Sequence, residues 1–523
     1  MTLCQKHFEQ TKKLAEQLDP DEVAQWLLSH GYFPEQYVLP PSFAVQEFPL
    51  SREPYFAATG TKSRSYKTDL SEIETISFPR SVLTVRAFGI IEPRIYHDLT
   101  WQLTRDWEAV VDCIFDSCLR IFSYSFPIPV TTREKRTLSG LRAGRMIYEF
   151  IEMAENDLVG EAYKYRFLLK TDVTNCYASI YTHAVSWGIH GKEAARGDRF
   201  RYDLVGTKID KLLQNANDGR TNVIAIGPAI CDIVSEILLA AVDKHCTESL
   251  LRQSIDFIGV RFKDDYRFLY TSEADANTIA KALQSSLNQN NLSLSEEKSE
   301  VLRLPEGLFR PWTSEYKHWS LKWKKSISYR SFESALLSVL SIDERFPGTG
   351  VIDRFLSDLS SRRFNLKLTV TEAQARKTYS LLMLLKQRRP KSFPSILAII
   401  EAMLNKYDSY KAFRDYVAES LTDMLKGALQ KAEENEYDII WILHFLRSVL
   451  DLEADRTLDT TNHIVRSVSE NHQCFYDSTI GIGLFQTVQY PTSRNHLLRH
   501  LAISQRKNEG KQNQQEEDSN DGA

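Results

Sequence analysis

Hydrophobic and polar residues follow two different rhythms along the chain, and the change between them divides the sequence. Over residues 73–305, short β-rich runs such as RFLLKTD, DFIGVRF and YRFLYTS alternate with helix-like stretches such as GPAICDIVSEILLAAVDKH. This alternation predicts an α+β domain built on a small antiparallel sheet. After about residue 330 the strand signals fade, and apolar residues recur at the spacing of amphipathic helices. We therefore expect an all-α domain over residues 306–503.

The two ends of the chain have their own patterns. A capping signal at Asp19 to Glu22 begins a helix, and the proline-rich run over residues 38–66 predicts an extended connector, so residues 1–72 form an N-terminal lead-in. Residues 504–523 contain few apolar side chains, which predicts a disordered tail. Thr371 and Gln374 form a capping-box start in the helical half, where short loops favour a bundle or a HEAT-like solenoid without a clean repeat.

Composition narrows the class of protein. A chain of 523 residues exceeds one ordinary domain. Its net charge of −4 neither favours nor excludes a nucleic-acid partner, because only the local field of a groove matters. Seven scattered cysteines without zinc-site spacing indicate reduced thiols. The chain has no apolar signal segment and no uninterrupted run of about 18 apolar residues, so we expect a cytoplasmic protein without membrane contact.

Three acidic residues carry the candidate chemistry. Asp172 ends the apolar run FLLKTD, and Asp264 and Asp265 lie between two β-rich runs that read as a hairpin. An Asp-Asp pair alone is more often a simple turn. A third carboxylate at a neighbouring strand end changes that balance, because adjacent carboxylates repel and hard oxygen donors suit Mg²⁺ or Mn²⁺. Two such ions about 3.5–4 Å apart would support nucleotidyl transfer.

Four segments in order strengthen this hypothesis. TDVTNCYASIYTH resembles motif A of reverse transcriptases, GRTNVIAIGPAICDIVSEILLAAVD motif B, FKDD motif C and LSLSEEKSEVL motif D. The resemblance covers about residues 75–305 and implies a fingers/palm domain that synthesises DNA. It assigns two divalent metal ions to the side chains of Asp172, Asp264 and Asp265 and to the backbone carbonyl of Val173.

The same resemblance assigns residues to the incoming nucleotide. Tyr177 would crowd a ribose 2′-hydroxyl and favour deoxynucleoside triphosphates, although an aromatic packed in the core is the simpler reading. Arg80 and Arg86 would grip the triphosphate, with exposed strand arginines as the alternative. Gly227 would let nucleotide or template approach the backbone closely. Lys298 would act as a general acid towards pyrophosphate, or is a solvated lysine.

Two further groups of residues lie near these motifs. Asp232 and Glu236 follow the glycine-proline turn and are interpreted as surface or first-turn dipole partners rather than catalysts. The run HGKEAARGDRFRYD interleaves basic and aromatic residues, which suits a nucleic-acid backbone as well as a solvated loop. Its basic members are Lys192, Arg196, Arg199 and Arg201.

Departures from ordinary reverse transcriptases point to a subgroup. Motif C begins with Phe262 and Lys263, motif B reads IGPAICD, and a helical region replaces the thumb after residue 305. With the stretch YTHAVSWGIHGK, this layout resembles the bacterial abortive-infection (Abi) polymerases, AbiK-like and prophage-borne. That resemblance implies antiphage defence by template-independent DNA synthesis. The single-stranded product would be attached covalently to a tyrosine of a homo-oligomer such as a trimer.

Alternatives remain open at this level. The 23 tyrosines leave the primer unassigned, with Tyr32, Tyr37 and Tyr55 near the lead-in as candidates. A templated reverse transcriptase of retron or intron type would need added RNA and would release DNA free of protein. A catalytically idle polymerase fold could serve as a scaffold or phage sensor, although the intact set of three acids argues against it.

Overall fold

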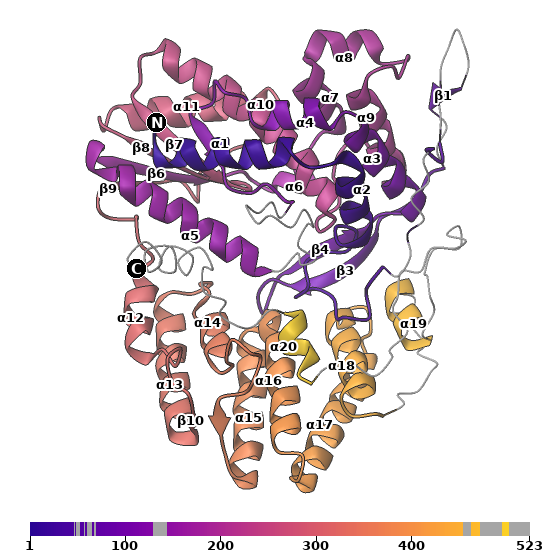
Figure 1. Cartoon of the computed structure of the whole chain (residues 1–523), viewed down its shortest axis with the longest axis vertical. Helices are drawn as coiled ribbons and strands as arrows, with labels where there is room; N and C mark the ends of the chain where they lie inside the picture. The colour runs from indigo at the N-terminus through magenta and orange to yellow at the C-terminus, as the bar shows by residue number, and fades with distance from the viewer. Residues whose placement is uncertain are drawn as a thin grey trace, which may run out of the picture. The chain divides into compact units, whose positions relative to one another are not determined.

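The computed structural model describes most of the chain, which forms two compact units (Figure 1). The described residues are 1–45, 48, 53–56, 58–59, 65–66, 69–128, 144–452, 462–470 and 494–501. The predicted disordered tail at 504–523 lies outside them. The first unit comprises Met1–Ser77, Ala87–Phe309 and Thr461–Thr487, and the second comprises Phe78–Arg86, Arg310–Thr460 and Val488–Ala523. The N-terminal lead-in therefore belongs to the first unit, and the chain as a whole is a mixed α+β protein.

A five-stranded sheet organises the first unit. Its order is β5-β7-β8-β6-β9. The strands are β5 (Ile121–Ser123), β6 (Phe167–Asp172), β7 (Phe257–Phe262), β8 (Asp265–Tyr270) and β9 (Glu300–Arg303). β5 pairs with β7 in parallel, and the other neighbours are antiparallel. The sequence predicts an antiparallel sheet, which describes every pair except the parallel one between β5 and β7.

Helices surround this sheet. α2 begins as its sequence predicts, because the Asp19 carboxylate accepts a hydrogen bond from the Asp21 N–H (2.8 Å) and Pro20 occupies the first position. α10 is buried all round over residues 229–240, becomes exposed towards its C-terminal end, and packs against α11, α7 and α4. The first-unit helices are α1 (Leu3–Glu16), α2 (Pro20–Ser29), α3 (Pro93–Arg105), α4 (Trp107–Ile114), α5 (Gly144–Glu161), α6 (Cys176–Ser179), α7 (Thr182–His190), α8 (Lys192–Asp198), α9 (Val205–Asn215), α10 (Ala229–Arg252), α11 (Asp275–Asn288) and α19 (His463–Glu470), with a 3₁₀ turn at Ala162–Lys164.

Two short strand pairs complete the N-terminal part. β1 (Ala58–Thr59) pairs antiparallel with β2 (Ser65–Tyr66), and β3 (Glu74–Pro79) pairs with β4 (Val85–Ile90). The tip that joins β3 to β4, residues 78–86, is grouped with the second unit. There the Phe78 ring packs edge-on against Tyr437 at 5.2 Å between centroids.

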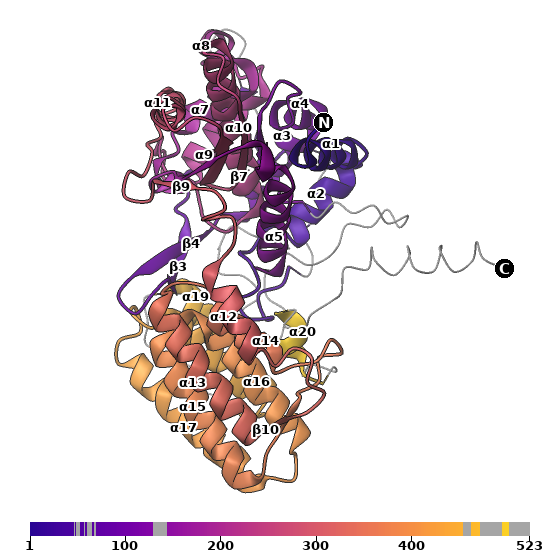
Figure 2. The same ribbon diagram turned by 90° about the vertical axis from the view of Figure 1, so that its left-hand side faces the viewer.

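The second unit is predominantly helical, and its neighbouring helices lie side by side (Figure 2). The predicted capping box is confirmed, because the N–H groups of Gln374 and Thr371 donate reciprocally to the Thr371 hydroxyl and the Gln374 side chain. One departure from an all-α unit is the parallel pair β10 (Ile327–Ser328) and β11 (Leu368–Thr369). The helices are α12 (Pro311–Trp319), α13 (Tyr329–Arg345), α14 (Val351–Asp358), α15 (Glu372–Arg388), α16 (Phe393–Lys406), α17 (Lys411–Leu429), α18 (Glu436–Ser448) and α20 (His496–His500), with a 3₁₀ turn at Pro390–Ser392.

Candidate active site

Three carboxylates meet where β6 ends and the β7–β8 hairpin turns. Asp172 is the last residue of β6 and lies directly opposite Asp265, the first residue of β8. Asp264 occupies the two-residue turn with Lys263, whose φ of 51° is the left-handed conformation that such hairpin turns use. The Val173 N–H donates to the Asp264 carbonyl oxygen at 3.1 Å. The strand register therefore brings together the three acids that the sequence singles out.

Their electrostatics favour a cation. Burial, and after it the negative charge of Asp172, raises the pKa of Asp264. Burial raises the pKa of Asp265 to about 7, together with a hydrogen bond to Asp172 and the charges of Asp264 and Asp172. Carboxylates that share a small space resist ionisation unless a positive charge joins them. A divalent cation is the partner that such a group lacks.

Lys298 partly fills that role in this conformation. Its ammonium lies 2.7 Å from the Asp172 Oδ2. Of the residues that the structure describes, no three or more His, Cys, Asp or Glu side chains form a ready metal cage. The donor set nevertheless fits Mg²⁺ or Mn²⁺ in chemical type, because it offers only carboxylate and backbone oxygens. Asp172, Asp264 and Asp265 would hold such ions once Asp172 is freed from Lys298, beside the buried backbone of Val173.

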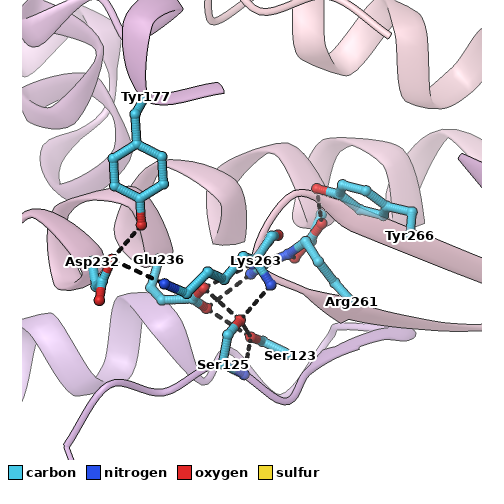
Figure 3. Close-up of polar contacts among 9 residues, drawn as sticks. Ser123, Ser125, Tyr177, Asp232, Glu236, Arg261, Lys263 and Tyr266 are labelled. Carbon is cyan, nitrogen blue, oxygen red and sulfur yellow. Dashed lines mark hydrogen bonds and ion pairs between the residues drawn. The ribbon is translucent and has the colours of Figure 1, made fainter. Parts of the chain in front are cut away.

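Tyr177 is held next to this site by a carboxylate of α10. Its hydroxyl donates to the Asp232 Oδ1 (Figure 3). Burial, and then the charge of Asp232 and this hydrogen bond, raise the pKa of Tyr177 well above its usual range. The Lys263 ammonium of the hairpin turn lies 3.5 Å from the same Asp232 oxygen. Asp232 thereby couples the aromatic ring to the turn that carries Asp264.

A buried network of ion pairs and hydrogen bonds connects α10 to the β7–β8 hairpin. Both Glu236 oxygens accept hydrogen bonds from the Arg261 guanidinium, at 2.9 and 3.1 Å (Figure 3). Arg261 also donates to Asp243 at 2.9 Å. The Tyr266 hydroxyl donates to Asp243 at 2.8 Å. The hydroxyls of Ser123, in β5, and of Ser125, just after it, also donate hydrogen bonds to the Glu236 carboxylate.

The sequence interpretation of Asp232 and Glu236 as surface residues was wrong. Asp232 does lie in the first turn of α10, but both side chains are buried. The reason is that residues 229–240 of α10 are covered on every side, so Asp232 and Glu236 are paired by side chains from the hairpin and from α6. Periodicity within one helix carries no information about such partners.

Gly227 has a different surrounding from the one expected. Its φ is +124°, and a Cβ at this position would lie 2.7 Å from the Pro34 Cγ and 3.1 Å from the Phe88 ring. Protein side chains therefore fill the space where a Cβ would lie, and the approach of a nucleotide or template to this backbone stays a prediction. The glycine allows close packing of the turn before α10.

Arg80 and Arg86 belong to a different unit from the three carboxylates. Both are exposed and lie in the hairpin tip that is grouped with the second unit. The Arg80 N–H donates to the Thr84 carbonyl at 2.9 Å and closes the turn. Their assignment to the triphosphate stays a prediction.

The basic run between motifs A and B forms an ordered helix and turn. Lys192, Arg196, Arg199 and Arg201 are all exposed. The segment is fixed by Asp198, whose carboxylate accepts hydrogen bonds from backbone N–H groups at the start of α9. The Lys192 ammonium lies 4.4 Å from the centre of the Trp187 ring, and the Arg199 guanidinium 5.3 Å from that of Phe200.

The three primer candidates differ in access. Tyr32 is buried, and its hydroxyl donates to the Ile91 carbonyl at 2.6 Å. Tyr37 is half-buried. Tyr55 is 43% exposed and packs edge-on against His97. Tyr163, which sequence reasoning passed over, is 82% exposed at the 3₁₀ turn before β6.

Comparison with known proteins yields similarity of structure alone. No model of a known protein family matches the chain, and no curated protein matches it. Among solved structures, apo telomerase from Candida tropicalis is similar at 11% identity and a TM-score of 0.32, over 74% of this chain and 70% of that one. Candida albicans telomerase with a TWJ fragment of telomeric RNA is similar at 11% identity and a TM-score of 0.30, over 69% of this chain and 68% of that one. Candida tropicalis telomerase with such a fragment is similar at 12% identity and a TM-score of 0.31, over 79% of this chain and 65% of that one. No activity follows from similarity at this level.

No helix among the described residues has both the length and the apolar character needed to cross a membrane.

The crowded carboxylates predict a pH-dependent stability in metal-free protein. Because the pKa of Asp265 rises from its usual 3.8 to about 7, the folded state binds this proton more tightly than the unfolded state. Stability should therefore fall as pH rises from about 4 to 7. Water around the exposed edge of Asp265 will reduce the size of this effect. Melting curves in EDTA across that range should show the decline.

Above neutral pH, Mn²⁺ should raise the melting temperature again, since ionised carboxylates are its ligands. Asp265→Asn is the matched control, because it removes the titrating group and keeps its shape. A pH slope that is unchanged in Asp265→Asn would contradict this assignment.

Proposed function

We propose that the chain is a DNA polymerase that transfers nucleotides from deoxynucleoside triphosphates by a two-metal mechanism. The observation that carries the proposal is the register of β6 and β8, which sets Asp172 opposite Asp265 with Asp264 in the adjoining turn. Carboxylates that converge from two neighbouring strands are the ligands that a two-metal phosphoryl-transfer site requires.

The chain's own residues have separate tasks in this reaction. Asp172, Asp264 and Asp265 would hold the two Mg²⁺ or Mn²⁺ ions. Divalent cations, when bound, supply activation of an attacking hydroxyl and neutralisation of the leaving pyrophosphate. Lys298, whose amine already lies within the site, would move to donate its proton to the pyrophosphate as Asp172 engages a metal ion. Tyr177, fixed by Asp232, would exclude a 2′-hydroxyl.

We further propose that this polymerase acts in the bacterial cytoplasm in abortive infection. Its reaction needs no template and begins on a tyrosine of the chain itself, within a homo-oligomer such as a trimer. The support is the order of the four motifs, together with a predominantly helical second unit where a thumb would follow. HEAT-like pairing of those helices, a fingers/palm arrangement of the first unit and triphosphate contacts from Arg80 and Arg86 belong to the same proposal. Among the three primer candidates, the exposure of Tyr55 favours it.

The test is incubation of the purified chain with deoxynucleotides and Mg²⁺ or Mn²⁺, without primer or template. DNA that partitions with protein on phenol extraction, and is released by protease, supports the proposal. Product that forms only after RNA is added, and is free of protein, would identify a templated reverse transcriptase. If no DNA formed with or without added RNA, and phage resistance survived Asp264→Ala, the chain would be a catalytically idle scaffold.

The ring of Tyr177 should set the preference for deoxynucleotides. In Tyr177→Ala, the ratio of kcat/KM for deoxynucleotides over ribonucleotides should fall by about 10- to 100-fold, because a pocket discriminates by excluded volume. The measurement is incorporation of single nucleotides of each kind. Tyr177→Phe is the matched control, since it keeps the ring and loses only the bond to Asp232. An unchanged ratio in an active Tyr177→Ala enzyme would refute the role.

A further inference from the structure

One segment of the second unit combines strong positive charge with exposed tryptophans. Residues 317–330 read KHWSLKWKKSISYR and contain no acidic residue. We call its tryptophans, lysines and arginine, all exposed except the half-buried Lys322, the tryptophan–lysine platform. Its members are Lys317, Trp319, Lys322, Trp323, Lys324, Lys325 and Arg330.

The tryptophans of the platform are unusual in this chain. Trp323 is 76% exposed and Trp319 is 44% exposed. By contrast, Trp26, Trp107 and Trp441 are buried in the cores of their units. An indole left in water loses the stabilisation that burial would give, so an exposed pair in one short segment indicates a binding surface.

A buried carboxylate fixes the turn from which Trp323 projects. Asp358 is 0% exposed, and its Oδ2 accepts hydrogen bonds from the Tyr316 hydroxyl (2.7 Å), the Ser320 hydroxyl (2.6 Å) and the Leu321 N–H (3.1 Å). All three donors belong to the end of α12 and the turn that follows. Their convergence on one buried acid holds this backbone in a single conformation.

A buried lysine fixes the same turn from its acceptor side. The Lys367 ammonium donates to the carbonyl oxygens of Leu321 (2.9 Å) and Lys322 (3.2 Å). The Ile327 N–H donates to the Lys367 carbonyl at 2.9 Å and carries the chain into β10. Because these bonds hold the backbone around Trp323, binding there would have to order little additional main chain.

Positive charge gathers around the rings of the platform. The Lys322 ammonium lies 5.1 Å from the centre of the Trp323 ring. The acids nearest in sequence are Glu315 and Glu333. Glu315 forms an ion pair with Arg345, and Glu333 accepts a hydrogen bond from the Tyr329 hydroxyl at 3.3 Å. Residues 317–330 thus carry five cations and no acid beside two exposed indoles, despite a chain net charge of −4.

We propose that this platform binds single-stranded nucleic acid, with bases stacked on Trp323 and Trp319 and phosphates neutralised by the surrounding lysines. Exposed aromatics among cations are the combination that binds single strands without regard to sequence. A membrane-surface site needs a helix with a broad apolar face, whereas here two tryptophans project among five cations. The occupant that fits the proposed function is the chain's own single-stranded DNA product.

This assignment to the product depends on the proposed function, but binding can be tested apart from it. Fluorescein-labelled oligothymidylate is titrated with the full chain in EDTA and without nucleotides, so no synthesis contributes. Trp323→Ala should weaken binding by about 10- to 100-fold, and the Trp319→Ala, Trp323→Ala pair should weaken it further. Because Trp323 is exposed, its removal should leave the melting temperature unchanged.

Charge variants give an independent readout. Lys324→Gln with Lys325→Gln should lower the slope of log affinity against log salt by about 1.4, since each lost phosphate contact removes about 0.7 for a single strand. Lys426→Gln, an exposed lysine on α17, is the matched control and should leave the slope unchanged.

Oligonucleotide affinity that is unaltered in both the tryptophan and the lysine variants would overturn the proposal while leaving the carboxylate site untouched. Binding to vesicles of phosphatidylcholine and phosphatidylserine that is lost in Trp323→Ala, without any effect on the oligonucleotide, would also overturn it in favour of a membrane surface. If the unaltered chain bound the oligonucleotide but synthesised no DNA, this would count against the proposed function alone.

Discussion

Asp264→Ala will lower the rate of deoxynucleotide incorporation by about 10³-fold or more. Metal-ion stabilisation of transition-state charge supplies several kcal/mol, and each 1.36 kcal/mol is about tenfold in rate. Asp264 lies in the turn between β7 and β8, where its carbonyl pairs with Val173 and its carboxyl is crowded by Asp172. Removal of this side chain leaves the strand register intact but takes away one metal donor. Single-turnover incorporation at saturating Mg²⁺ or Mn²⁺ measures the effect.

A second measurement separates metal binding from folding. Mn²⁺ affinity, followed by electron paramagnetic resonance, should fall in Asp264→Ala and in Asp172→Asn. Asp256→Asn is the matched control, because Asp256 is an exposed acid that precedes the opposite end of β7. Incorporation by Asp264→Ala within about tenfold of the unaltered chain would remove the carboxylates from the mechanism.

The carboxylate site was accessible from sequence because its signals are local. Asp172 follows an apolar run, and Asp264 with Asp265 interrupts two β-rich runs, so each acid could be placed at a strand end before any pairing was known. Strand ends that share one sheet edge bring their side chains together. The register that sets Asp172 opposite Asp265 was not predictable in detail, because it depends on pairing across nearly a hundred residues of chain.

Contacts between side chains of distant elements were not predictable from the sequence. Glu236 was expected at the surface, yet the buried Arg261 of β7 is its counter-ion. At Gly227 the sequence does not show that Pro34 of the N-terminal lead-in packs where a Cβ would lie. The ring of Tyr177 needed Asp232 to fix it. None of these pairings leaves a trace in periodicity or composition, which report only which face of one element is apolar.

The tryptophan–lysine platform has a compositional signal in the sequence. An acid-free run with five cations and two tryptophans is a compositional signal. Its meaning required the structure, because only the exposure of Trp323 and the anchoring by Asp358 distinguish a binding surface from a core helix end.

Arg261→Met will destabilise the first unit by about 3–5 kcal/mol, which is the usual result of removing one partner from a buried ion pair. Arg261 is buried between Glu236 and Asp243, with three charge-assisted hydrogen bonds to them. Its loss leaves two carboxylates in the interior without a counter-ion. Urea unfolding followed by a signal from the first unit should show the change. Arg252→Met, at the exposed end of α10, is the matched control and should be nearly neutral.

The origin of that destabilisation can be tested by removing the stranded charges. Arg261→Met combined with Glu236→Gln and Asp243→Asn should recover part of the lost stability, because the desolvation of two unpaired carboxylates is the main cost. Arg261→Lys should restore less, since an ammonium cannot reproduce the forked contact with both Glu236 oxygens. If the triple variant were less stable than Arg261→Met alone, uncompensated charge would not be the cause. The guanidinium would then act mainly by packing beneath the β7–β8 hairpin, and the position of Asp264 would depend on shape more than on charge.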